Sequence, residues 1–218
     1  QVQELMKKLM DVDFGNPSSR HQKGVVAEGY IKEARQKIAA TLKVDPKELI
    51  ITSGGTESNN MALIGTALAA KRKGNHIITT AVEHPSVKAT ASFLEEQGFR
   101  ITFLSVDSRG QISLEDLKEA LTPDTILVSI MYVNNEIGTI QPVEEAAKLV
   151  HATVPGAVFH VDAIQAYGKV MIRPKQQGID LLSVSSHKFH GPKGAGFLYC
   201  SSKVNLHPII FGGGQQSG

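Results

Sequence analysis

The chain has 218 residues, of which 41% are hydrophobic and 20% charged, so it can bury most of its unfolded surface in one large domain. A formal net charge of +2 gives no footprint for nucleic acid or an anionic membrane, and no apolar run approaches the roughly 20 residues that span a bilayer. The single cysteine excludes an internal disulfide framework and favours a reducing compartment, so we expect a cytoplasmic protein.

Apolar spacing along the chain changes repeatedly between helical and strand-like patterns. Val2, Leu5 and Met6 share one face of a first helix, and a helical period continues over 24–44. Beyond that point, short apolar runs typical of strands alternate with helical stretches. We expect strands at 49–52, 76–82, 99–106, 125–133, 157–162, 179–184 and 196–200, and helices at 57–73, 85–94, 114–121 and 141–153. This alternation predicts an α/β fold, a mostly parallel sheet sandwiched by helices.

Both ends of the chain fall inside unfinished patterns. Gln1 lies within a helical pattern and is not an initiator Met, while 211–218 is a glycine-rich run that completes no element. We therefore expect residues 1–218 to be one domain of a longer protein, with an N-terminal segment missing.

A glycine turn joins a predicted strand to a predicted helix at 53–60. Such a turn is an anion site, because backbone N–H groups and the helix dipole point at one spot. Gly54 and Gly55 allow close approach of the backbone, and Thr56 adds a hydroxyl. The turn is neither a P-loop nor a G-x-G-x-x-G motif, and an ordinary βα turn remains the alternative.

Polar residues also follow three other predicted strands. His84, Asn135 and Asp162 each stand at or just after a strand's carboxyl end, with Gln165 three residues beyond the last. In sheets of this kind, residues at these positions line the ligand crevice. Each of them alone would more often be structural.

Lys188 lies in the connection between the predicted strands 179–184 and 196–200. Ser185 and His187 precede it, and a Gly-Pro turn follows. A lysine that is partly desolvated and near other cationic groups can act as an amine nucleophile, although a lone loop lysine is usually only solvated.

Together these parts match the needs of pyridoxal phosphate (PLP). Its phosphate needs a helix N-terminus and hydroxyls, and its ring nitrogen needs a carboxylate. Its phenolic oxygen needs hydrogen-bond donors, and its aldehyde needs a lysine. The order of these groups along an alternating α/β chain predicts a PLP enzyme.

Seven motifs spread across the chain carry a resemblance to a known family. They are FGNPSSRH (14–21), TSGGTESNN (52–60), EHPSV (83–87), VNNEIG (133–138), HVDAIQ (160–165), SSHKFHGPKG (185–194) and FGGGQQSG (211–218). With these motifs the chain resembles the large domain of a cysteine desulfurase, in the class V branch of fold-type I PLP-dependent aminotransferases.

The resemblance implies a role for each polar group at the cofactor ring. Lys188 would bind the PLP aldehyde and shuttle protons, and His84 would stack on the ring and assist proton transfer. Asp162 would pair with the pyridinium nitrogen. Asn135 and Gln165 would approach the phenolic oxygen and the substrate.

The resemblance also implies the phosphate site and the reaction. Gly55 and Thr56, with Ser185 and His187, would hold the phosphate. Family members take L-cysteine and give L-alanine and a persulfide, which supplies sulfur for iron–sulfur clusters or other sulfur-containing cofactors. A homodimer and a sulfur-acceptor or scaffold protein as partner are implied by the family alone.

The sequence departs from the family pattern after FGGGQ. The Arg-Ser-Gly-Thr run and the smaller domain with the persulfide cysteine are not in this sequence. Cys200 ends a predicted strand, so we expect a core thiol rather than the nucleophile. The chain is therefore expected to hold the cofactor yet to be unable to desulfurate by itself.

Three other interpretations remain open at this stage. One is a selenocysteine lyase or another class V PLP lyase, and one is a catalytically incomplete PLP-binding module. The third is a metalloenzyme built on His187, His190, His160 and Asp162, in which Lys188 would have no role. Our prediction for the site contains no metal.

Overall fold

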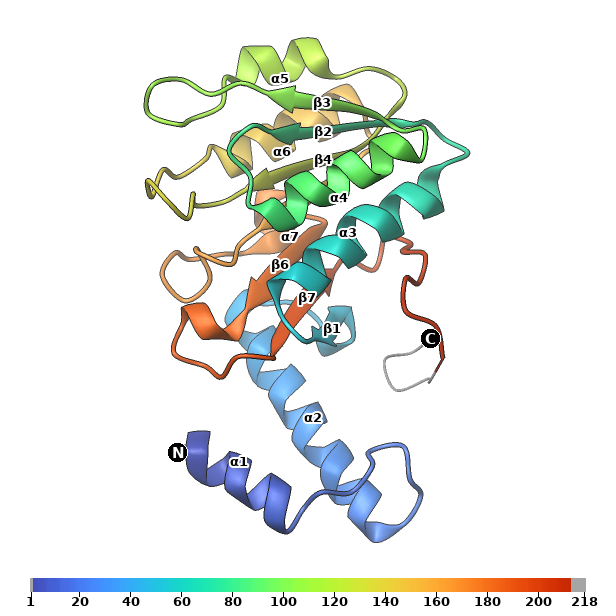
Figure 1. Ribbon diagram of the computed structural model, residues 1–218, viewed down its shortest axis with the longest axis vertical. Coiled ribbons are helices and arrows are strands. Elements are labelled where there is room, and N and C mark those ends of the chain that lie inside the picture. Colours follow the sequence, from blue (N-terminus) through green and yellow to red (C-terminus); the bar gives the residue numbers. More distant parts are fainter. Residues whose placement is uncertain (1, 213–218) are drawn as a thin grey trace. The chain divides into compact units, whose positions relative to one another are not determined.

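The computed structural model describes residues 2–212 (Figure 1). Most of the FGGGQQSG motif at 211–218 therefore lies outside the described residues. The chain divides into two compact units, one containing residues up to Leu49 together with Phe211 and Gly212, and one from Ile50 to Ile210. None of the helices among the described residues is long and apolar enough to cross a membrane.

The first unit consists of helices. It contains α1 (Val2–Asp11), α2 (Gln22–Leu42) and the 3₁₀ turn η1 (Pro46–Glu48). Tyr30 of α2 donates its hydroxyl proton to Asp13 Oδ2 at 2.8 Å, which ties α2 to the loop that follows α1. The helix predicted at 24–44 is confirmed, with its start shifted to Gln22.

The second unit is organised around one sheet. Within the described residues the sheet contains seven strands: β1 (Leu49–Thr52), β2 (His76–Thr80), β3 (Arg100–Leu104), β4 (Thr125–Met131), β5 (Val158–Asp162), β6 (Leu181–Ser185) and β7 (Gly196–Cys200). Their order is β1-β7-β6-β5-β4-β2-β3. The pairs from β3 through β2, β4 and β5 to β6 are parallel, and β7 runs antiparallel to β6. The predicted α/β class with a mostly parallel sheet is confirmed.

Helices cover both faces of this sheet. Figure 1 shows α3 (Gly55–Ala70) and α4 (Pro85–Glu96) in front of the strands and α6 (Val143–Thr153) behind them. Two shorter helices, α5 (Leu114–Ala120) and α7 (Pro174–Gln177), pack next to α6. Every residue of β2, β4 and β6 is buried, as a parallel sheet covered on both faces requires.

Two histidines lie inside the sheet as buried polar residues. His160 of β5 hydrogen-bonds through Nδ1 to Ser129 Oγ at 2.8 Å and through Nε2 to Ser183 Oγ at 2.9 Å. His76 of β2 is held in the same way between the hydroxyls of Thr125 and Thr102. Burial lowers the pKa of His160 to about 3 and that of His76 to about 4, so both rings are neutral core groups.

The topology places a crevice outside the carboxyl ends of the central strands. β2 and β4 are neighbours, but β2 continues into α4 on one face and β4 continues into α6 on the other. Two adjacent connections that leave a sheet toward opposite faces open a space between them. His84, Asn135 and Asp162 belong to the segments that border this space.

Candidate active site

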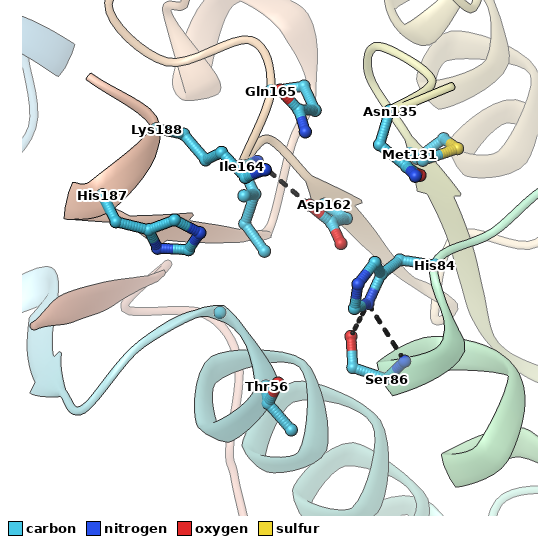
Figure 2. Close-up of a pocket in the computed structure, with 11 residues that line it drawn as sticks. Thr56, His84, Ser86, Met131, Asn135, Asp162, Ile164, Gln165, His187 and Lys188 are labelled. Carbon is cyan, nitrogen blue, oxygen red and sulfur yellow. Dashed lines mark hydrogen bonds between the residues drawn. The ribbon is translucent and has the colours of Figure 1, made fainter. Parts of the chain in front are cut away.

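A pocket of about 210 Å³ lies at this edge of the sheet (Figure 2). Its lining comes from segments that follow or end five strands: Gly55, Thr56, His84, Ser86, Met131, Asn135, Asp162, Ile164, Gln165, His187 and Lys188. Every residue that the sequence analysis assigned to the site lines this pocket, except Ser185. Ser185 Oγ lies behind the lining, 2.8 Å from His187 Nδ1.

One wall of the pocket is the N-terminus of α3. The helix begins at Gly55, and a Cβ at that residue would overlap Ile164 Cδ1. Such a Cβ would also lie 3.6 Å from Ser185 Cβ, so Ser185 stands beside the glycine turn. The first N–H groups of a helix have no partner within it, and here they border a cavity together with the Thr56 hydroxyl.

Lys188 ends the 3₁₀ turn η2 (Ser186–Lys188), which follows β6 directly. Ser186 N donates to Ala195 O at 3.0 Å and Gly191 N donates to Ser186 O at 2.9 Å, so backbone bonds close the loop around the turn. The side chain of Lys188 is exposed, because the turn lies beyond the end of the sheet. In Figure 2 that side chain extends toward Asp162.

Asp162 supplies a buried carboxylate at the floor of the pocket. Its Oδ2 accepts from Asn59 Nδ2 at 2.8 Å, and its Oδ1 accepts from Ile164 N at 3.0 Å. Burial raises the pKa of Asp162, and these hydrogen bonds oppose the rise. Among the described residues, no ion pair includes Asp162. A cationic group of a ligand beside Asp162 would further favour its charged form.

His84 lies across the pocket from Lys188 and caps the N-terminus of α4. Its Nδ1 accepts from Ser86 N at 3.1 Å and lies 2.8 Å from Ser86 Oγ. Within the described part of the chain, no hydrogen bond involves Nε2. One ring nitrogen is thus held by the protein, while the other is left for a ligand.

Two buried residues of this region were missed by the sequence analysis. Asn59 of α3 bonds to Asp162 and also donates to Ser86 Oγ at 2.9 Å. Its position four residues after Gly55, on the same helix face, was the available signal. Glu83 accepts from Thr80 Oγ1 and from Met131 N, both at 2.8 Å, so it ties the turn after β2 to the end of β4. Burial raises the pKa of Glu83 to about 8.

The residues of the alternative metal site do not gather. Both ring nitrogens of His160 are bound by serines, and His160 does not line the pocket. The described residues contain no group of three His, Cys, Asp or Glu side chains that could hold a metal ion. Cys200 packs partly buried against the hydrophobic core that includes Leu181 and Leu198.

Known proteins resemble this chain in both sequence and structure. The family described as Aminotransferase class-V matches residues 1–217. "Putative cysteine desulfurase IscS 1" of Bacillus subtilis (strain 168) is 51% identical over 215 residues, and the match covers 99% of this chain and 56% of that protein. "Cysteine desulfurase IscS" of Dictyoglomus turgidum is 49% identical, with 100% and 55% covered. The chain thus spans a little more than half the length of these curated relatives.

Two solved structures resemble the fold of this chain over nearly its whole length. A protein titled "NIFS-LIKE PROTEIN" superposes with a TM-score of 0.97 at 42% identity, over 100% of this chain and 60% of that one. A second structure, titled "SspA in complex with cysteine", gives a TM-score of 0.94 at 41% identity, over 99% of this chain and 62% of the other.

Proposed function

The chain belongs to the class-V aminotransferase family, and we propose that it is the PLP-binding large domain of a cysteine desulfurase. Members of this family depend on PLP. In the full-length enzyme, L-cysteine and an enzyme thiol would give L-alanine and an enzyme persulfide. The sulfur would then pass to iron–sulfur clusters or other sulfur-containing cofactors.

One observation carries this proposal: a helix N-terminus, a buried carboxylate and a lysine amine surround one pocket. Asp162 lacks a cationic partner among the described residues, and the pyridinium nitrogen of PLP would provide one. A Cβ on Gly55 at the start of α3 would overlap the Ile164 side chain, so the glycine lets Ile164 pack closely against the helix N-terminus, where a phosphate would meet backbone N–H groups. The residues present therefore fit PLP.

Each site residue has a task that its position supports. PLP supplies an electron-withdrawing ring, and Asp162 keeps the ring nitrogen protonated. Lys188 holds the cofactor covalently and moves a proton to or from the substrate. Asn135 and Gln165 donate hydrogen bonds from their amides on the substrate side.

The phosphate end of the pocket is polar. Gly55 and Thr56 contribute the helix N-terminus and a hydroxyl. His187 lies beside them, and its Nδ1 is held by Ser185 Oγ at 2.8 Å. With Nδ1 engaged, Nε2 of His187 is the nitrogen that can bind a phosphate oxygen.

The wider setting of the protein belongs to the same proposal. We infer a cytoplasmic homodimer that transfers sulfur to an acceptor or scaffold protein, in keeping with the IscS names of its relatives. Selenocysteine lyase, the alternative, has less support, because the relatives described above carry cysteine desulfurase names.

The proposal is tested with the full-length protein, loaded with PLP and given L-cysteine. We expect alanine and persulfide in equal amounts, and a loss of at least about 100-fold in Lys188→Ala, the low end for removal of a positioned proton-transfer group. Lys193→Ala, an exposed lysine of the same loop, is the matched control and should retain activity. Alanine formation that survives Lys188→Ala, or turnover of L-selenocysteine alone, would contradict the proposal.

A further inference from the structure

A chain of hydrogen bonds behind the pocket joins His84 to Asp162. Asn59 Nδ2 lies 2.8 Å from Asp162 Oδ2 and 2.9 Å from Ser86 Oγ, and Ser86 Oγ lies 2.8 Å from His84 Nδ1. Asn59 is completely buried and Ser86 nearly so. Both residues stand inside motifs of the family resemblance, but the resemblance gives neither of them a role, and only the structure shows the bond that joins them.

The proton positions in this series of hydrogen bonds follow from the chemistry of the groups at its two ends, Asp162 and His84. A carboxylate only accepts hydrogen bonds, so the side of the Asn59 amide that faces Asp162 must be its NH₂ group. The second N–H of that group points to Ser86 Oγ, which therefore accepts. The Ser86 hydroxyl proton is then left to point toward His84 Nδ1.

A second donor acts on the same ring nitrogen. Ser86 N–H lies 3.1 Å from His84 Nδ1, and a backbone N–H can only donate. His84 Nδ1 thus faces two donors from one residue and must be unprotonated. The neutral ring carries its proton on Nε2.

The buried amide of Asn59 supports a role beyond packing. Its Oδ1 is buried and has no hydrogen-bond partner among the described residues. An orphaned buried acceptor costs stability, which an apolar side chain of similar size would avoid. Unlike an apolar side chain, Asn59 donates two hydrogen bonds, one to Asp162 and one to Ser86.

We propose that Asn59 and Ser86 are positioning residues that fix His84 as the tautomer with its proton on Nε2. This inference deepens the proposed function, because it rests on His84 facing the bound cofactor and substrate. His84 then offers a hydrogen-bond donor to an anionic atom in the pocket, such as a thiolate or a phenolate oxygen. It does not act as a base at Nε2, since accepting a proton there first requires moving the existing one to Nδ1, against both donors.

The direct test is solid-state ¹⁵N NMR of the full-length cofactor-free protein, labelled at the histidine rings. The His84 signals are identified by their loss in His84→Asn. We expect a protonated Nε2 and an unprotonated Nδ1 in the natural protein. In Ser86→Ala, which removes one of the two donors, the share of the Nδ1–H tautomer should rise roughly three- to tenfold. Asn59→Leu should shift it in the same direction by freeing the Ser86 hydroxyl.

Two controls separate positioning from general damage. Ser86→Thr keeps the hydroxyl and should keep the natural tautomer, and Asn60→Ala, the neighbouring amide on α3, should leave the His84 signals unchanged. A protonated Nδ1 in the natural protein, or an unchanged tautomer ratio in Ser86→Ala, would overturn the inference.

Addition of PLP to the same samples distinguishes this inference from the proposed function. If the expected tautomer is found but no visible PLP band forms, the proposed function fails and the positioning role stands. If the band forms normally but Ser86→Ala keeps the natural tautomer, the positioning role fails and the proposed function stands.

Discussion

His160 and His84 are both histidines near serine hydroxyls, yet the protein uses them in opposite ways. His160 is completely buried within the sheet and both of its ring nitrogens are bound by serines. His84 lies just beyond the carboxyl end of β2, with only Nδ1 engaged and the ring on a pocket wall. A polar group is available for chemistry when the fold leaves part of its bonding capacity facing a cavity.

Two acidic residues, Asp180 and Asp162, differ in a similar way. Asp180 accepts from Phe159 N at 2.9 Å and lies 3.4 Å from His151 Nε2, so a basic partner accompanies it. Asp162 receives hydrogen bonds from two neutral donors, and no ion pair of the described residues includes it. Of these two carboxylates, Asp162 is the one that can still pair with a cationic group of a ligand in the pocket.

Removing the structural histidine should have the largest effect on stability. His160→Ala leaves the Ser129 and Ser183 hydroxyls unpaired beside a new cavity, so we expect the free energy of unfolding to fall by about 3 kcal/mol. His84→Asn is the matched variant, because asparagine also caps a helix N-terminus, and it should change stability by less than about 1 kcal/mol. Urea unfolding of both variants measures the difference. Equal losses would show that the two histidines do not differ in the way described.

Glu83 should give a smaller effect that depends on pH. Its folded pKa of about 8 lies above the ordinary value of 4.5, because burial disfavours the charged form. Between these two values the unfolded chain has lost the proton that the folded chain keeps. The stability contributed by Glu83 is therefore full below about pH 4.5 and is lost as the pH rises toward 8.

Glu83→Gln removes this titration and keeps an oxygen that can accept from Met131 N. The measurement is the free energy of unfolding of both proteins between pH 5 and 8. As the pH rises, the variant should become more stable relative to the natural protein, by an amount on the order of a few kcal/mol at pH 8. The buried histidines titrate in both proteins, so their contributions cancel in the difference. A difference that stays constant with pH would mean that Glu83 is ionised in the folded protein.

Much of the fold follows from local pattern in the sequence. The seven residues of β4 are apolar enough to be predicted directly, and α4 is marked by Pro85 at its first position. The four-residue helix α7 was not predicted, because so short a segment shows no helical period. The sequence also located the site residues at the ends of strands, since parallel topology brings such ends together.

The support behind the site could not be predicted in the same way. The bond from Asn59 to Asp162 joins residues 103 positions apart, and only the packing of α3 against the sheet brings them together. The sequence also left open whether Lys188 is solvated or partly desolvated, because local sequence does not show which surfaces the rest of the chain will cover; the structure shows it exposed.

The central claim is that the Lys188 amine at this edge of the sheet holds PLP covalently. The direct measurement is treatment of the PLP-loaded full-length protein with borohydride, which makes a bond between PLP and a lysine amine permanent, followed by peptide mass spectrometry. The account predicts the added mass on the peptide containing Lys188 and no stable adduct in Lys188→Ala. An adduct on another lysine, such as Lys193, or no adduct in the natural protein, would contradict it.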